Sequence, residues 1–298
     1  MPSSFKNQTI TITKRETKMK KTLLALLSIG IAFTAIQPAQ AQDQKVIAII
    51  DTAIDSKKVP SVIYEACFTE NKSCPNKTNF MEGAGSANSS VWPTSMISDV
   101  YHGHNVTQVA LSANPTVKIV FVRIANITAA GNSTNTPGAL NLAIDWVSKN
   151  AEKYSIDAVS ISQSSISTNN LNACTRNTTV INAVSSLNAK NIPVFAATGN
   201  DRSASVVGYP ACINGVIGVG AVVPALNLIA PSTNTGPGLD VLAIGTVDVV
   251  RYNGTVATIS GTSVASPRAA SLYVKNNTSG LQNFISSLNK FLAFPLIN

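Results

Sequence analysis

The chain has 298 residues, of which 45% are hydrophobic and 12% are charged, and its formal net charge is +8 at pH 7. This length and apolar content suit one or two domains with a sizeable core. Residues 1–41 carry six basic side chains and one acidic one, so their removal lowers the net charge from +8 to +3. No dense lysine or arginine cluster remains, which argues against nucleic acid as a partner.

The first 41 residues have the three parts of a secretory signal peptide. The basic segment Lys18–Lys21 precedes an apolar run from Leu23 to Ile36, and Ala39-Gln40-Ala41 has the small side chains that a signal peptidase requires. The apolar run, of about 14 residues, is short for a membrane span. Met19 also resembles a translation start, so residues 1–18 are open to being an upstream extension. We therefore expect a secreted or periplasmic mature chain, residues 42–298, that is not bound to a membrane.

Short runs rich in β-branched residues predict buried parallel strands. Between them, residues 137–153 and 178–190 place apolar side chains on one helical face, and residues 281–291 predict a closing helix. Strands that alternate with such helices form βαβ units. We expect an α/β fold of one domain, in which helices cover both faces of a parallel sheet in three layers. The predicted strands are Val46–Ile50, Val117–Ile124, Ile156–Ile161, Ile192–Ala197 and Val216–Val222.

Four cysteines, all beyond the signal segment, indicate an oxidising compartment. Cys67 and Cys74 enclose a short polar loop and are candidates for a local disulfide, which would leave Cys174 and Cys212 for a second one. Metal binding is the alternative, but the sequence has no CxxC motif and no histidine near these cysteines. Disulfides are the favoured interpretation.

Polar residues follow two of the predicted strands, at the sheet edge where functional groups of parallel sheets gather. Asp51 can accept a hydrogen bond from an imidazole Nδ1–H, or can cap a turn. Asp55 is less suited because it lies beyond the strand end. Asn200 can donate its amide to an oxyanion, or can form a turn with Asp201.

The chain has two histidines, His102 and His104, at the start of a predicted helical run over residues 105–113. Either can act as a general base, or can be a polar cap in a surface loop. The segment Gly261-Thr262-Ser263-Val264-Ala265-Ser266-Pro267 places Ser263 at a helix start, where backbone N–H groups and the helix dipole favour negative charge. An ordinary N-cap is the alternative for this serine.

Together these segments resemble the subtilisin-like serine proteases, or subtilases. They follow the family's order of aspartate strand, histidine helix, oxyanion segment and serine motif. The likeness spans about residues 45 to 275, and the histidine motif selects His102 over His104. The matching segments are Val46-Ile47-Ala48-Ile49-Ile50-Asp51-Thr52, His102-Gly103-x-x-Val106, Ala197-Thr198-Gly199-Asn200, and Gly261-Thr262-Ser263 with Pro267.

The resemblance implies a serine endopeptidase that acts on polypeptides through an acyl-enzyme. Ser263 is then the nucleophile, His102 the base and Asp51 the group that stabilises the imidazolium, while Asn200 and the Ser263 N–H bind the oxyanion. No cofactor is required by this chemistry. Calcium is common in the family, although no oxygen-ligand loop can be named in the sequence.

The family binds an extended peptide as an added strand. The segment that matches its substrate strand is Ser162-Gln163-Ser164, where Gln163 and Ser164 replace the usual Leu-Gly, and residues 131–133 are a candidate opposite rail. A pocket lined by these residues and by Ala197, Thr198 and Gly199 has no charge. This predicts a preference for uncharged side chains before the cut.

Other interpretations stay open. Only a short stretch separates the expected signal cleavage from Asp51, so we expect no folding propeptide within the chain, and a separate folding helper or inhibitor is a candidate partner. The same residues also suit a catalytically weak or inactive protein that binds peptides without cutting them. Esterase or peptide-ligase use of the same acyl-enzyme is a third interpretation.

Overall fold

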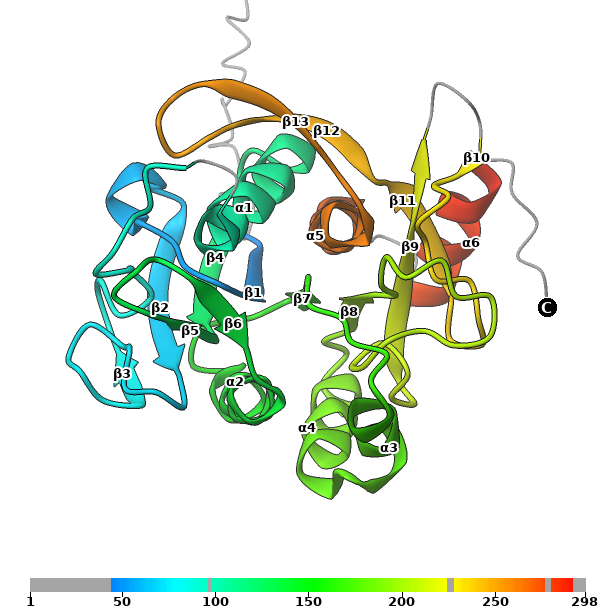
Figure 1. Cartoon of the computed structure of the whole chain (residues 1–298). Helices are drawn as coiled ribbons and strands as arrows, with labels where there is room; N and C mark the ends of the chain where they lie inside the picture. Colours follow the sequence, from blue (N-terminus) through cyan, green and yellow to red (C-terminus); the bar gives the residue numbers. More distant parts are fainter. Residues whose placement is uncertain (1–43, 96–97, 224–227, 277–279, 292–298) are drawn as a thin grey trace, which may run out of the picture. The chain divides into compact units, whose positions relative to one another are not determined.

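A computed structural model describes residues 44–95, 98–223, 228–276 and 280–291, so the expected signal peptide lies outside the described residues. A mostly parallel sheet forms the centre, in the order β10-β9-β8-β7-β1-β4-β2-β3, with β11 on β9 (Figure 1). Its strands are β1 (Val46–Asp51), β2 (Val62–Phe68), β3 (Phe80–Glu82), β4 (Lys118–Arg123), β7 (Ala158–Ile161), β8 (Val194–Ala197), β9 (Val216–Val223), β10 (Leu228–Ile229) and β11 (Val241–Ile244).

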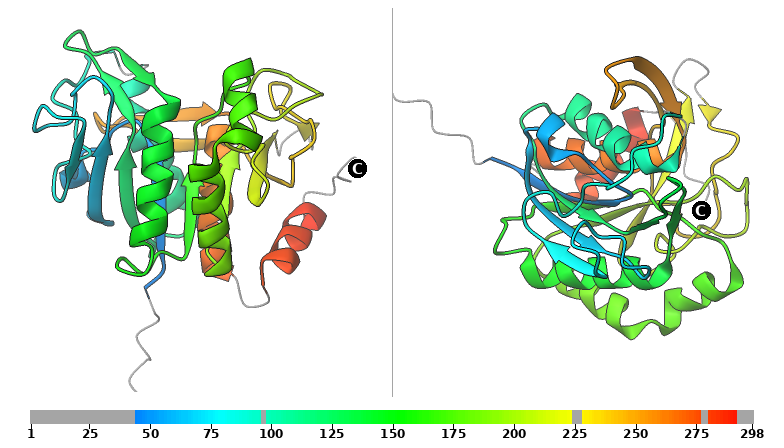
Figure 2. Two further views of the ribbon diagram at one scale, coloured as in Figure 1. Left: turned by 90° about the horizontal axis from the view of Figure 1, so that it is seen from below. Right: turned by 60° about the vertical axis from the view of Figure 1, so that its left-hand side comes forward.

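Helices cover both faces of this sheet, as Figures 1 and 2 show. One face carries α1 and α5, and the other carries α2 and α4. The helices are α1 (His102–Ala113), α2 (Pro137–Asn150), α3 (Thr168–Arg176), α4 (Thr178–Ala189), α5 (Thr262–Asn276) and α6 (Leu281–Phe291). Two small ribbons pair β5 (Ala125–Ile127) with β6 (Ser133–Asn135) and β12 (Thr246–Val250) with β13 (Val256–Ser260).

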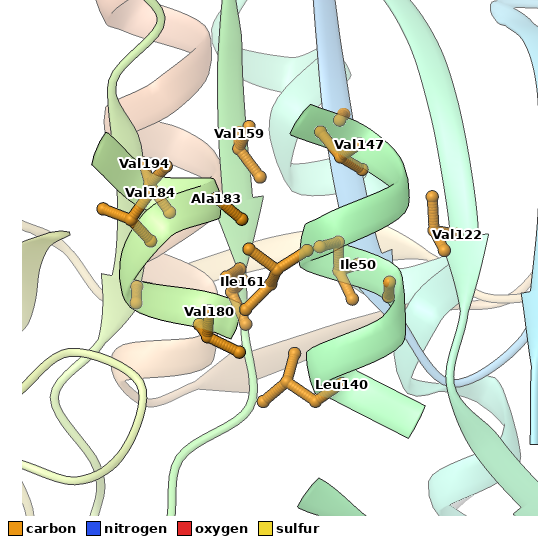
Figure 3. Close-up of a cluster of buried hydrophobic side chains, with 14 of the residues drawn as sticks. Ile50, Val122, Leu140, Val147, Val159, Ile161, Val180, Ala183, Val184 and Val194 are labelled. Atoms are coloured by element: carbon orange, nitrogen blue, oxygen red, sulfur yellow. The ribbon is translucent and has the colours of Figure 1, made fainter. Parts of the chain in front are cut away.

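The alternation of side chains along β1 explains why both faces are covered. Ala48 and Ile50 point into a core with α2 and α4, whereas Ile47 and Ile49 point into a second core with α1 and α5. Figure 3 shows the first core, where Leu140 and other apolar side chains meet the strands. A strand buried on both faces needs a continuous apolar sequence, which is the pattern that predicted it.

The predicted α/β sheet with helices on both faces is confirmed, with one difference. The sheet is mixed, because β3 pairs antiparallel with β2 and β10 pairs antiparallel with β9. Both antiparallel strands are short and follow their partner in the chain. A local reversal of the chain joins antiparallel neighbours and requires no crossover helix.

Both expected disulfides are present. Cys67 at the end of β2 bonds to Cys74, with a Cα–Cα distance of 6.0 Å. Cys174 of α3 bonds to Cys212, with a Cα–Cα distance of 5.6 Å. In the described part of the chain, no helix combines the length and the apolar character that crossing a membrane would require.

Candidate active site

Asp51 and His102 form a hydrogen-bonded pair where β1 ends and α1 begins. The Asp51 side chain is fully buried, and its Oδ1 lies 2.8 Å from His102 Nδ1. The same oxygen accepts the backbone N–H of Thr52 at 2.7 Å. The His102 side chain is 30% exposed. With Nδ1 directed at the carboxylate, Nε2 is the ring nitrogen that remains for proton transfer.

The start of α1 is held against the end of β1 by two sequence features. Thr52 Oγ1 accepts the N–H of Gly103 at 2.8 Å and donates to the carbonyl of Val100 at 3.2 Å. Gly103 has no Cβ, and a Cβ there would lie only 2.7 Å from Ala53 O. The threonine after Asp51 and the glycine after His102 therefore fix the separation of the pair.

Ser263 lies in the first turn of α5, and a proline four residues later affects its carbonyl. Pro267 has no N–H, so the carbonyl of Ser263 lacks the usual helical donor. Ser162, just after β7, supplies the missing hydrogen bond from its Oγ at 2.9 Å. Ser162 was predicted as a substrate contact, and in the structure its hydroxyl holds the backbone of Ser263.

Asn200 is tied to the segment that carries Ser263. Its Oδ1 accepts both the N–H and the hydroxyl of Thr262, at 3.0 and 3.2 Å. The Nδ2 group is thus the end of Asn200 that can donate to a ligand. Gly261 has a φ of +134°, and a Cβ there would lie 3.2 Å from Asn200 Nδ2. Glycine therefore suits both the backbone angle and the close approach of the amide.

A cleft of about 320 Å³ brings His102, Asn200 and Ser263 together. Of the predicted substrate contacts, Ser162, Gln163, Ser164 and Gly199 line this cleft. Ala197 and Thr198 do not, because both are buried beneath its surface. The full lining is Thr52, Asp99, His102, Asn135, Ser162, Gln163, Ser164, Gly199, Asn200, Asp201, Thr262 and Ser263.

Residues 42–275 match the model of the subtilase family, peptidase family S8. The chain belongs to the subtilase family. Over 274 residues it is 29% identical to subtilisin DY of Bacillus licheniformis, a match that covers 87% of this chain and 89% of that protein. It is also 29% identical to subtilisin E of Bacillus subtilis over 229 residues, which are 75% of this chain and 53% of that protein.

Solved structures have the same fold. Proteases from Pseudoalteromonas arctica align with a TM-score of 0.63 and 19% identity, over 83% of this chain and 82% of theirs. A cold-adapted subtilisin-like serine proteinase aligns with a TM-score of 0.57 and 21% identity, over 82% and 81% of the two chains. At these identities the likeness concerns the fold alone.

The two histidines of this subtilase have different surroundings. Burial lowers the pKa of His102, but the charge and hydrogen bond of Asp51, together with the charge of Asp99, raise it above the ordinary histidine value. His104 is buried with its ring edge-on to Tyr252, 5.9 Å between centroids, and burial lowers its pKa. The prediction that His102 is the histidine paired with Asp51 is confirmed.

The walls of the subtilase cleft differ from the expected ones in two respects. The wall facing Gln163 is formed by Asn135 of β6, and residues 131–133 are not in the lining. Two carboxylates, Asp99 and Asp201, also line the cleft, in addition to the uncharged residues expected there. Asp201 directly follows Asn200, and its position after the oxyanion segment could have indicated it.

Ser164 occupies space that two glycines leave open. A Cβ at Gly199 would lie 2.8 Å from Ser164 Oγ, and a Cβ at Gly208 would overlap the same oxygen. This Oγ is buried and makes no hydrogen bond within the described residues. In the same described ranges, no group of three or more His, Cys, Asp or Glu side chains is placed to hold a metal ion, so no calcium ligands are assigned.

Proposed function

We propose that this subtilase is a secreted serine endopeptidase that hydrolyses peptide bonds through Ser263, His102 and Asp51. The observation that carries the proposal is the hydrogen bond from His102 Nδ1 to the buried carboxylate of Asp51, with Ser263 in the same cleft. The family consists of serine peptidases, so polypeptides are the expected substrates. Nucleic acid and membranes are not expected partners.

The proposed reaction begins with attack of Ser263 Oγ on the peptide carbonyl carbon. His102 Nε2 takes the hydroxyl proton as the C–O bond forms, and gives it to the leaving amine as the C–N bond breaks. The acyl group then remains on Ser263 as an ester. Water, deprotonated by His102, attacks this ester and releases the acid, which restores the serine. No cofactor takes part in these steps.

Asp51 and the oxyanion donors contribute charge stabilisation to both steps. The Asp51 carboxylate holds the proton on His102 Nδ1 and stabilises the imidazolium that forms after proton transfer. Asn200 Nδ2 and the Ser263 N–H donate to the carbonyl oxygen when it becomes negative. The position of Ser263 in the first turn of α5 supports this role, because such N–H groups have no partner within the helix.

Secretion is supported by two features of the chain. Both disulfides are typical of proteins that reside in an oxidising compartment. Residues 1–41 have the pattern of a signal peptide, which would direct the protein to the periplasm or the exterior.

A fluorophosphonate probe tests the proposed nucleophile. We expect one covalent adduct per chain, located at Ser263 by peptide mapping, together with hydrolysis of casein that the probe abolishes. Protein unfolded in denaturant provides the control and is expected to give no adduct, because an unactivated serine does not react. Absence of both adduct and casein hydrolysis in folded protein would favour the alternative of a peptide-binding protein that does not cut.

The role of Asn200 can be tested with two substitutions. Asn200→Ala and Asn200→Asp both remove the Nδ2 donor, and we expect kcat to fall about 10²–10³-fold, as for other oxyanion donors, with little change in KM. Asn200→Asp keeps an oxygen for Thr262, so it controls for the loss of that anchor. Near-normal kcat in Asn200→Asp, with a large loss in Asn200→Ala, would show that Asn200 acts only through Thr262.

A further inference from the structure

The Gln163 side chain bridges the cleft wall and the buried carboxylate. Asn135 Nδ2 in β6 donates to Gln163 Oε1 at 2.5 Å. Gln163 Nε2 donates to Asp51 Oδ2 at 3.4 Å. A glutamine amide has one accepting end and one donating end, and the Asp51 carboxylate can only accept. The Nε2 end of Gln163 therefore faces Asp51, and the Oε1 end is held by Asn135.

The two oxygens of Asp51 have separate partners. Oδ1 is shared by the Thr52 N–H and His102 Nδ1, whereas Oδ2 receives the amide of Gln163. A buried carboxylate requires hydrogen-bond donors, because burial removes its water. The bond to Oδ2 is long, which makes it weak, but its acceptor is charged in the active state. By donating to Oδ2, Gln163 is thus placed to weaken the electrostatic attraction between the Asp51 carboxylate and a protonated His102.

We propose that Gln163 is a positioning residue of the catalytic triad, which orients Asp51 through Oδ2 and is itself oriented by Asn135. Its effect on turnover rests on the proposed function, whereas its effect on His102 does not. Asn135 is exposed on the wall along which an extended peptide would lie. A substrate that engages Asn135 would therefore alter the hydrogen bond that reaches Asp51.

The sign of the effect follows from the charges around His102. Asp51 faces it from β1, Asp99 from the turn before α1, and Asp201 lines the same cleft, which has no lysine or arginine among its described lining residues. Asp51 and Asp99 both favour the imidazolium. The amide of Gln163 opposes this by donating to Asp51. Loss of the amide should raise the pKa of His102 further above its ordinary value.

Titration of the imidazole by NMR in the full chain measures this effect without turnover. The chain has two histidines, so a His104→Gln background assigns His102. We expect Gln163→Leu to raise the pKa of His102 by about half a pH unit, the shift that loss of one modest hydrogen bond produces. Gln163→Glu, which adds a like charge beside Asp51, should raise it by about one unit or more.

Two substitutions in β6 test the part played by Asn135. Asn135→Ala should move the pKa of His102 in the same direction as Gln163→Leu, but less, because Gln163 keeps its donor and loses only its orientation. Thr134→Ala is the matched control, since neighbouring side chains in a strand point to opposite faces. It should leave the titration unchanged.

The kinetic counterpart is the acid limb of kcat/KM against pH. In active protein this limb should move to higher pH by the same amount as the NMR titration, because His102 must be neutral to act as a base. An unchanged His102 titration in both Gln163 variants would overturn the positioning role. A shifted titration in protein that hydrolyses no peptide would overturn the proposed function and leave the positioning role supported.

Discussion

Ser263→Ala is expected to lower kcat on a peptide substrate by about 10⁶-fold, the loss typical of a subtilase triad without its nucleophile. The alanine has no oxygen to attack the carbonyl, so no acyl-enzyme forms. Initial rates with a fluorogenic peptide, compared with the uncatalysed rate, measure the loss. Some acceleration over water should remain, roughly 10³–10⁴-fold, because Asn200 and the peptide-binding walls are intact.

Ser266→Ala is the matched control in the same helix. Ser266 is fully buried, and its Oγ contacts Ser160 Oγ and the carbonyl of Phe195, away from the cleft. Its replacement should lower the free energy of unfolding by about 1 kcal/mol and leave kcat unchanged. Equal activity of Ser263→Ala and wild type would rule out Ser263 as the nucleophile. If both wild type and Ser263→Ala bind a peptide tightly and neither hydrolyses it, a binding function would be supported.

The core of the fold was predictable because the strands around the site are buried on both faces. Such strands have continuous runs of apolar residues, as in Val46–Ile50 before Asp51, and these runs stand out from amphipathic helices. The polar residue that follows such a run, as Asp51 does, can be recognised in the sequence in the same way. Strand β2 was missed because Glu65 interrupts its apolar run, and this glutamate is buried because it accepts the N–H groups of Gly85 and Ala87. The edge strand β3 was missed because it has only three residues, two of them exposed.

The cleft walls were less predictable for a different physical reason. Gln163 and Asn135 are 28 positions apart in loop and ribbon segments, where no periodic pattern indicates which side chains meet. Ala197 and Thr198 illustrate the reverse problem. They adjoin Asn200 in the sequence, yet the strand carries them into the core, so adjacency to a functional residue did not place them in the cleft.

Motif residues that take no part in the proposed reaction make hydrogen bonds that position the serine segment, or leave a group that requires one. Thr262 joins Asn200 to the serine segment, and its Oγ1 also accepts the N–H of Gly199 at 3.2 Å. Pro267 leaves a carbonyl that Ser162 satisfies. These contacts connect β7, β8 and α5 at one edge of the sheet. The motif therefore specifies the position of the serine as well as its identity.

Asp51→Asn is expected to lower kcat about 10⁴-fold, although the side chain keeps its size. Asn Nδ2 directed at His102 would donate to Nδ1, and the imidazole proton would then reside on Nε2. That tautomer cannot accept the proton of Ser263. The opposite orientation would place Nδ2 against the donating amide of Gln163, which Asn135 holds in place. The first orientation also turns Nδ2 toward the Thr52 N–H, which donates to Oδ1 of Asp51. Neither orientation therefore satisfies every neighbouring donor, and both lose the charge that stabilises the imidazolium.

Asp55→Asn provides the control for charge near the end of β1. Asp55 caps a short helical turn by accepting the N–H of Lys57 at 3.2 Å, and it does not line the cleft. Its replacement removes the same charge and should leave kcat unchanged. The double variant Asp51→Asn with Gln163→Glu tests the cause of the loss. Glutamate can accept from Asn Nδ2, which turns Oδ1 of residue 51 toward His102, so part of kcat should return. No recovery in a folded double variant would show that the missing charge, and not the tautomer, accounts for the loss.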